Sequence, residues 1–276
     1  MKASQLRRRS LLTLGLSLVA ASVFVQAQTA TQTFTPEVGQ PGKDVVWVPT
    51  PQTMVDKMLD MAKVTPQDFV IDLGSGDGRT VITAAKRGAR AQGIEYNPDM
   101  VALSQRNAAA EGMSARATFA KADLFESDFS QASVITMFLL PEINLRLRPK
   151  ILDLKPGTRI VSNTFTMDDW SPDETATVST DCSTWCTALF WIVPAKVDGA
   201  WQLPQGTLNL RQRFQVISGT LSSGTNTTAI TAATLRGDQI SFSAGGVQYT
   251  GGVNGNVMQG TTGTGASWRA TRAGGG

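Results

Sequence analysis

The sequence of 276 residues contains no histidine, and this absence excludes several kinds of active site at once. Ser-His-Asp and Cys-His sites need the imidazole as a base, and most catalytic zinc sites need it as a ligand. Chemistry in this chain must therefore rely on carboxylates, amides, hydroxyls and aromatic rings, or on an organic cofactor. We predict no metal site.

Cysteine is nearly absent as well, since Cys182 and Cys186 are the only two. Three residues separate them, whereas the thioredoxin-like motif has two. A metal site built on two cysteines would need further ligands, and histidine is not there to supply them. A close pair in an oxidising compartment favours a disulfide, so we predict a structural disulfide within a loop.

The first 27 residues contain no acid and have the pattern of an export signal. An arginine cluster at 7–9 precedes an apolar stretch over 11–25, and Val25-Gln26-Ala27 has the small-x-Ala cleavage pattern. The apolar stretch is shorter than the roughly 20 residues that cross a bilayer. Arg8-Arg9-Ser10-Leu11-Leu12 also approximates the twin-arginine pattern. We expect a signal peptide over 1–27, export to a bacterial periplasm and no stable membrane insertion after cleavage; an uncleaved anchor is the alternative.

Beyond that segment the chain has almost no net charge. Four of the 25 Lys and Arg residues lie within the first nine positions, and all 22 Asp and Glu residues follow Pro36. A strongly basic chain would attract phosphate-rich partners over long distances. We therefore expect no nucleic-acid partner.

Residue patterns divide the remaining chain into three parts. Residues 28–43 are rich in Thr, Gln, Pro and Gly, which is typical of a linker. Over 44–200 helical and strand patterns alternate, which favours an α/β fold: a Rossmann-like, doubly wound parallel sheet with helices on both faces. The helices are expected over 52–62, 79–87, 100–111 and 142–154, and the strands over 68–73, 89–95, 117–120, 133–139 and 159–165.

The third part, 201–276, has a different texture. It contains no lysine, and short runs of alternating polar and apolar residues are separated by glycine-rich turns. This pattern predicts a C-terminal antiparallel β-rich domain of about six short strands, either a small barrel or a sheet packed on the first domain. We interpret it as a stabilising appendage, with carbohydrate or envelope binding as the alternative.

One motif points to a cofactor. The expected strand over 68–73 is followed by Gly74-Ser75-Gly76-Asp77-Gly78, where glycine permits a sharp turn and a close approach to a ligand. A dinucleotide fingerprint would need glycine at Arg79, and a phosphate-binding P-loop would need Gly-Lys-Ser/Thr. An acid followed by three alternating glycines is instead the form used to bind S-adenosylmethionine (SAM).

Carboxylates at the ends of three successive strands strengthen this interpretation. Asp72 is placed to face the ammonium group of SAM, directly or through water, and Glu95 to grip the ribose hydroxyls. Asp123 is placed to accept from the adenine amino group, with Leu124 covering the ring. The predicted cofactor contacts are Asp72, Gly74, Ser75, Gly76, Asp77, Gly78, Glu95, Tyr96, Asp123 and Leu124.

At this point the chain resembles a known family. Val48-Pro49-Thr50-Pro51, the glycine motif, Glu95-Tyr96-Asn97-Pro98, Asp123-Leu124-Phe125 and Phe138-Leu139-Leu140-Pro141 are similar to the small lysine methyltransferases related to the mitochondrial enzyme that modifies the ATP synthase c-subunit. The resemblance covers about residues 45–165. It implies the sheet of class I methyltransferases and methyl transfer from SAM to a lysine amine of a protein acceptor.

Methyl transfer needs neither metal nor histidine, because positioning supplies much of the rate and an apolar pocket keeps the amine neutral. We expect Phe138, Pro141, Asn163 and Phe165 to line the acceptor pocket. Two alternatives stay open: a methyltransferase acting on a small molecule, and an exported SAM-binding or structural module without turnover.

Overall fold

The computed structural model describes Met1 and residues 34–274. The predicted signal peptide, apart from Met1, and the first part of the predicted linker lie outside the described residues. Among the residues described, no helix has the length and apolar character needed to cross a membrane.

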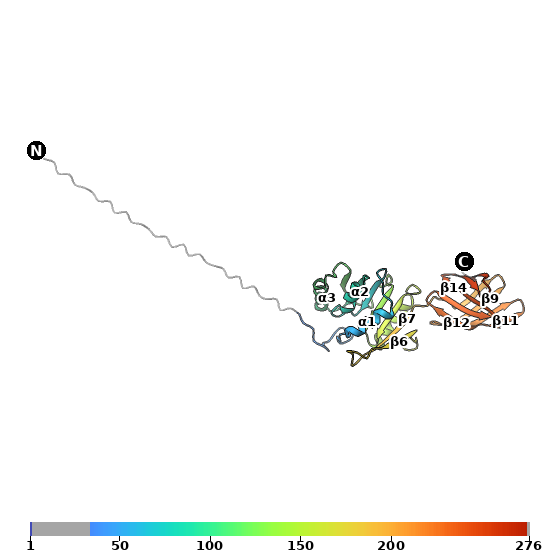
Figure 1. The fold of residues 1–276 in the computed structure, drawn as a ribbon, viewed down its shortest axis with the longest axis horizontal. Coiled ribbons are helices and arrows are strands. Elements are labelled where there is room, and N and C mark those ends of the chain that lie inside the picture. Colours follow the sequence, from blue (N-terminus) through green and yellow to red (C-terminus); the bar gives the residue numbers. More distant parts are fainter. Residues whose placement is uncertain (2–33, 275–276) are drawn as a thin grey trace. The chain divides into compact units, whose positions relative to one another are not determined.

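The α/β part contains a seven-stranded sheet in the order β3-β2-β1-β4-β5-β7-β6 (Figure 1). Strands β1 to β5 pair in parallel, whereas β7 pairs antiparallel with both β5 and the edge strand β6. The strands are β1 (Phe69–Leu73), β2 (Arg90–Glu95), β3 (Ala117–Lys121), β4 (Val134–Met137), β5 (Arg159–Asn163), β6 (Glu174–Thr177) and β7 (Thr187–Ile192). The helices are α1 (Gln52–Met61), α2 (Arg79–Lys86), α3 (Pro98–Ala110) and α4 (Pro141–Leu152).

All the helices and strands predicted between residues 44 and 165 are present, but the sheet is mixed. The prediction of a parallel sheet is therefore wrong at its edge, where β6 and β7 form an antiparallel hairpin. No helical pattern lies between β5 and β7, so the crossover that a further parallel strand requires is missing.

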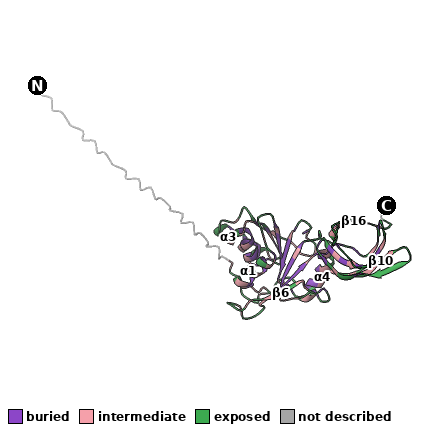
Figure 2. Cartoon of the chain, turned by 45° about the vertical axis from the view of Figure 1, so that its right-hand side comes forward, coloured by how far each residue is buried: buried purple, intermediate pink, exposed green. Residues whose placement is uncertain are grey.

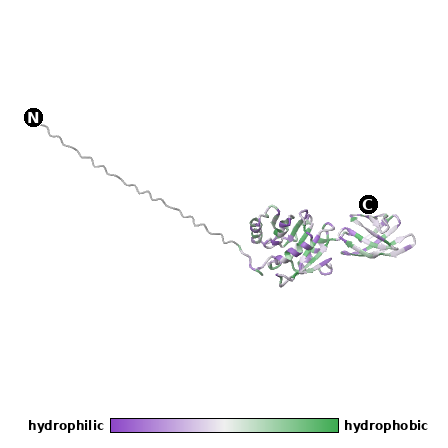
Figure 3. Ribbon diagram, viewed as in Figure 1, coloured by the Kyte–Doolittle hydropathy of each residue, from purple (hydrophilic) through white to green (hydrophobic). Residues whose placement is uncertain are grey.

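Apolar side chains pack on both faces of this sheet. Along β1, Val70 faces one core, which includes residues of α1 and α2, and Ile71 and Leu73 face the other, which includes residues of α4. This alternation is what successive residues of a strand require. Figures 2 and 3 show the same strands as buried and largely hydrophobic. The sheet is thereby held rigid, and its strand ends are fixed in place.

Local signals fix where α3 begins. The Asn97 side chain accepts hydrogen bonds from the backbone N–H groups of Asp99 and Met100, and Pro98 occupies the first helical turn. Asparagine at the N-cap and proline directly after it are the preferred residues at a helix start. The helix consequently begins at Pro98, close to Glu95 at the carboxyl end of β2.

The C-terminal part is a nine-stranded antiparallel sheet, not the six-stranded one expected. Its two edge strands, β11 and β12, are joined by Ile230 alone, so the sheet curls until its edges meet as in a barrel. Trp201, Leu208, Phe242 and Met258 are buried in its core. The strands are β8 (Gly199–Leu203), β9 (Gly206–Arg213), β10 (Val216–Ser223), β11 (Asn226–Ala229), β12 (Thr231–Arg236), β13 (Gln239–Ala244), β14 (Val247–Asn254), β15 (Val257–Thr262) and β16 (Ser267–Arg272).

Candidate cofactor and acceptor site

A cavity opens at the carboxyl ends of β1, β2 and β4, where ligands bind in sheets of this kind. Its empty volume is about 1030 Å³, counting the part open to solvent. Its lining comes from the segment Gln40–Thr50, Asp72, the turn 74–77, Glu95 to Asn97, Ala122 to Leu124 and Met137 to Leu139, with Arg79, Met100 and a few neighbours.

The turn after β1 has the conformation that its glycines permit. Gly74, Gly76 and Gly78 all have positive φ, between +53° and +83°. A Cβ at Gly76 would lie 2.6 Å from Nε1 of Trp47. Space and backbone conformation therefore both require glycine at position 76.

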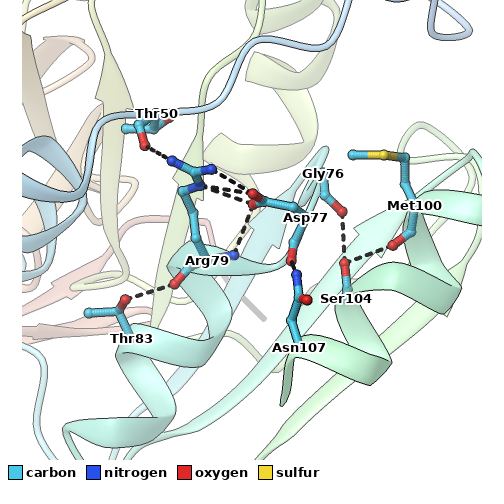
Figure 4. Close-up of polar contacts among 8 residues, drawn as sticks. All are labelled: Thr50, Gly76, Asp77, Arg79, Thr83, Met100, Ser104 and Asn107. Atoms are coloured by element: carbon cyan, nitrogen blue, oxygen red, sulfur yellow. Dashed lines mark hydrogen bonds and ion pairs between the residues drawn. The ribbon is translucent and has the colours of Figure 1, made fainter. Parts of the chain in front are cut away.

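Two side chains of α3 hold this turn from below (Figure 4). Oγ of Ser104 donates to the carbonyl of Gly76 at 2.7 Å, and Nδ2 of Asn107 donates to the carbonyl of Asp77 at 2.9 Å. The backbone of the turn is thus fixed before any ligand arrives, which lowers the entropic cost of binding.

Asp77 lines the cavity, and its carboxylate is engaged within the protein. Nε and Nη2 of Arg79 donate to it at 2.6–3.1 Å, and Nη1 of Arg79 donates to the carbonyl of Thr50 at 2.9 Å (Figure 4). A bidentate pair of this kind gives a fixed geometry. Asp77 and Arg79 therefore join the glycine turn to the segment that precedes α1.

Asp72 is the most deeply buried acid of the site, with 7 % of its surface exposed. Oγ1 of Thr136 donates to its carboxylate at 2.6 Å. Burial raises the pKa of Asp72 to about 7, and the negative charges of Asp77 and Glu95 act in the same direction. A cationic ligand group beside this carboxylate would favour its ionised form.

Both carboxylate oxygens of Glu95 accept hydrogen bonds from backbone N–H groups. Oε2 accepts from Gly76 at 3.0 Å and Oε1 accepts from Asn97 at 2.9 Å. An ionised carboxylate has about four acceptor positions, so two are left for a pair of hydroxyl groups. These backbone contacts fix the carboxylate, and Glu95 lines the cavity.

Asp123 and Tyr96 also line the cavity, and the structure links both to Lys43. Asp123 forms an ion pair with Lys43, which lowers the pKa of the carboxyl through a hydrogen bond and its positive charge. Nζ of Lys43 lies 5.1 Å from the centroid of the Tyr96 ring. Lys43 therefore neutralises the charge of Asp123. The predicted contact between Asp123 and adenine did not take this ion pair into account.

The segment Gln40–Thr50 is the part of the cavity that the sequence did not reveal. Residues 40–43 fall within the predicted linker, yet they line the site. A reciprocal pair of backbone hydrogen bonds, from Gly39 N–H to the Trp47 carbonyl and from Trp47 N–H to the Gln40 carbonyl, closes a loop. Trp47 lies outside the predicted linker, so its backbone pairing with residues 39 and 40 is the contact that the sequence pattern did not show.

Of the four residues predicted for the acceptor pocket, Phe138 lines the cavity. Phe165 stacks on it, with ring centroids 5.8 Å apart and an interplanar angle of 16°. Asn163 is buried at the end of β5, where its Oδ1 accepts from Thr164. Pro141 begins α4 and is absent from the cavity lining.

Cys182 and Cys186 form the disulfide bond that their spacing predicts. The bond lies in the loop between β6 and β7, and this loop carries Trp185. The Trp185 ring meets Phe138 edge to face at 5.8 Å. Nothing in the sequence pattern assigned Trp185 to the site.

The donor set of the cavity fits SAM, which has an ammonium group, a ribose diol and a flat adenine but no phosphate. Asp72 is a buried carboxyl that an ammonium group would hold in its ionised form, and Glu95 has free acceptor positions for the diol. The hydroxyl of Ser75 is buried and lacks a partner among the described residues.

The comparisons with known proteins agree with this donor set. The family model of the ANTKMT methyltransferase domain matches residues 72–174. The protein-lysine N-methyltransferase of Saccharolobus islandicus is 46% identical over 133 residues, which are 47% of this chain and 83% of that protein. The human lysine N-methyltransferase of the ATP synthase c-subunit is 35% identical over 128 residues, 46% of this chain and 54% of the human protein.

A solved structure has the same core. The structure described as an RNA methyltransferase from Salinibacter ruber, in complex with S-adenosylhomocysteine, is 44% identical, with a TM-score of 0.51. The match covers 54% of this chain and 96% of that one. Fold and site together define a class I SAM-dependent methyltransferase. More particularly, the chain belongs to the family of small methyltransferases that includes the Saccharolobus protein and the c-subunit lysine methyltransferases.

Proposed function

We propose that the protein transfers the methyl group of SAM to the side-chain amine of a lysine in a protein acceptor. The observation that carries this proposal is the position of the Phe138–Phe165 pair at the cavity that holds Asp72 and Glu95. The names of the Saccharolobus and human relatives support the same acceptor.

When bound, SAM would supply an electrophilic methyl group on a sulfonium. Asp72 and Glu95 hold and orient the amino-acid and ribose ends, which converts the encounter into a positioned, nearly unimolecular step. Phe138 and Phe165 would exclude water around the acceptor, and the positive sulfonium of bound SAM beside it would lower the pKa of its amine. Bound SAM would supply the methyl group for in-line transfer to this neutral amine, with S-adenosylhomocysteine and a proton released to solvent as the other products.

The test is incubation of the purified protein with CD3-labelled SAM and an extract of the cells that make it, followed by mass spectrometry. We expect the CD3 group on lysine Nε of one protein or a few. The matched control is the variant Glu95→Ala, which should bind SAM weakly and leave no label.

Other positions of the label would contradict the proposal. Label in RNA would support an acceptor like that named for the Salinibacter relative. Label only in small amines would support a small-molecule methyltransferase. SAM binding without any label would indicate a binding module without turnover.

We also propose that the protein is exported and acts outside the cytoplasm. The arginine cluster at 7–9, the apolar stretch 11–25 and the disulfide between Cys182 and Cys186 support this location. Fractionation of cells that produce a C-terminally tagged chain, with N-terminal sequencing of the product, tests it. We expect a periplasmic product beginning at Gln28; a cytoplasmic product that keeps Met1 would contradict it.

A further inference from the structure

Three aromatic side chains from separate segments meet beside the cavity. Phe138 follows β4, Phe165 follows β5, and Trp185 lies in the loop between β6 and β7. Phe165 stacks on Phe138, and Trp185 meets Phe138 edge to face, both with centroids 5.8 Å apart. We call these three residues the aromatic wall. Because Phe138 itself lines the cavity, the wall is continuous with the predicted cofactor site.

Trp185 is the exposed end of this wall. Its side chain leaves 42 % of its surface in water, which is unusual for so large an apolar ring. An acceptor that covered the ring would remove this apolar surface from water. The exposed area is therefore available for a contact with a substrate.

The loop holds Trp185 in a backbone conformation that bulky residues avoid. Asp181 and Trp185 both have positive φ, +51° and +55°. Such conformations persist only where the surrounding structure enforces them, and they cluster at functional sites. Here the disulfide between Cys182 and Cys186 closes a short covalent loop of the backbone that contains Trp185. The N–H of Val178 donates to the Cys186 carbonyl at 2.8 Å.

We propose that the aromatic wall binds the side chain of the acceptor lysine, and that the disulfide positions Trp185 for this contact. This inference rests on the proposed function, since lysine is the acceptor assumed there. Aromatic faces attract ammonium groups, and tryptophan does so most strongly. They also pack against the four methylene groups of lysine.

The same surface suits a lysine at successive stages of methylation. Each methyl group removes an N–H donor from the amine, and an aromatic wall offers no acceptor that would lose a hydrogen bond. Methylated ammonium groups are recognised by aromatic rings for this reason. We therefore expect the wall to bind trimethyl-lysine at least as well as lysine.

The first test measures binding without turnover. The chain has six tryptophans, and labelling with 5-fluorotryptophan gives each a fluorine NMR signal, with Trp185 assigned by Trp185→Phe. The probes are Nα-acetyl-lysine methylamide, its Nε-trimethyl form and the neutral norleucine analogue, each with S-adenosylhomocysteine present. We expect the Trp185 signal to move saturably with the two cationic probes and less with norleucine. An unmoved Trp185 signal overturns the proposal.

Substitutions measure how much Trp185 contributes to the affinity for the probes. Trp185→Ala should weaken the trimethyl-lysine probe by about 3- to 30-fold, the range for one cation–π contact. Its affinity for S-adenosylhomocysteine should stay unchanged, which shows that the cavity is folded. The matched control is Val216→Ala, which removes an exposed apolar side chain in the C-terminal part. Equal probe affinities of Trp185→Ala and the wild type would overturn the proposal.

The role of the disulfide is tested by a double-mutant cycle. Cys182→Ser with Cys186→Ser should weaken the probe in the wild-type background but have no further effect when Trp185→Ala is present. Full additivity would mean that the disulfide does not act through Trp185. If Trp185→Ala methylates lysine with an unchanged acceptor KM, only the proposal about the aromatic wall is refuted. If the probes bind but no methylated lysine is formed, only the proposed function is refuted.

Discussion

The affinity of the protein for SAM is predicted to depend on pH through Asp72. This carboxyl is buried, receives one hydrogen bond from Thr136, and has a pKa raised to about 7. The ammonium group of SAM favours the ionised carboxylate, so binding must release the proton below that pH. Each pH unit below about 7 should then weaken SAM roughly tenfold, or about 1.4 kcal/mol, with a plateau above.

The same group should have the opposite effect on folding. The pKa of Asp72 is higher in the folded chain than its ordinary 3.8, so the native state holds the proton more tightly than the unfolded state. Its contribution to stability is therefore complete below pH 3.8 and is lost as the pH rises through 7. The full difference corresponds to at most about 4 kcal/mol.

Asp72→Asn separates the two effects, because it keeps the shape of the side chain and removes its charge. The variant should be more stable than the wild type above pH 7, yet bind SAM weakly and with little dependence on pH. Urea unfolding measures the first quantity, and calorimetry from about pH 5.5 to 8.5 measures the second, a range that spans the raised pKa.

The matched ligand control is 5′-methylthioadenosine, which lacks the amino-acid end of SAM. Its affinity should not change with pH in the same interval. Equal SAM affinity at about pH 6 and about pH 8, one unit to either side of the raised pKa, would refute this role of Asp72. The same pH dependence for both ligands would refute it as well.

Three further predictions follow from contacts of the site. Gly76→Ala should abolish measurable SAM binding and lower stability by about 1–3 kcal/mol, because its Cβ meets Trp47; denaturant titration with calorimetry checks this, and wild-type values would contradict it. Glu95→Gln should weaken SAM by about 1.5–3 kcal/mol through the loss of charged acceptors, and a change below twofold would contradict it. Lys43→Met should raise the pKa of Asp123 toward its ordinary value, as measured by carboxyl NMR, since Lys43 is the main cause of its lowering; an unchanged pKa would contradict it.

The sequence predicted the parts of the site that follow directly from strands and turns. Strand alternation located the ends of β1 and β2, and the carboxyl ends of parallel strands meet at one edge of a sheet. These two facts are enough to bring Asp72, the glycine turn and Glu95 together, and all of them line or support the cavity. The pattern of 133–139 placed Phe138 beside them in the same way.

The sequence did not predict the contacts between distant segments that have no periodic pattern. Lys43 lies 80 residues from Asp123, and its neighbours have the composition of a linker. Trp185 reaches Phe138 only because β7 pairs antiparallel with β5, which brings the loop before β7 to the carboxyl end of β5. The nine-stranded C-terminal sheet was undercounted because glycines lie within its strands, for example Gly251 and Gly260, as well as in its turns.

The most direct test of the account is the joint measurement of S-adenosylhomocysteine formed and CD3-lysine formed, in one incubation of the protein with CD3-labelled SAM and cell extract. We expect equal amounts of both products with the wild-type protein, and neither product with Glu95→Ala. S-adenosylhomocysteine without CD3-lysine, or no product from a protein that binds SAM, would contradict it.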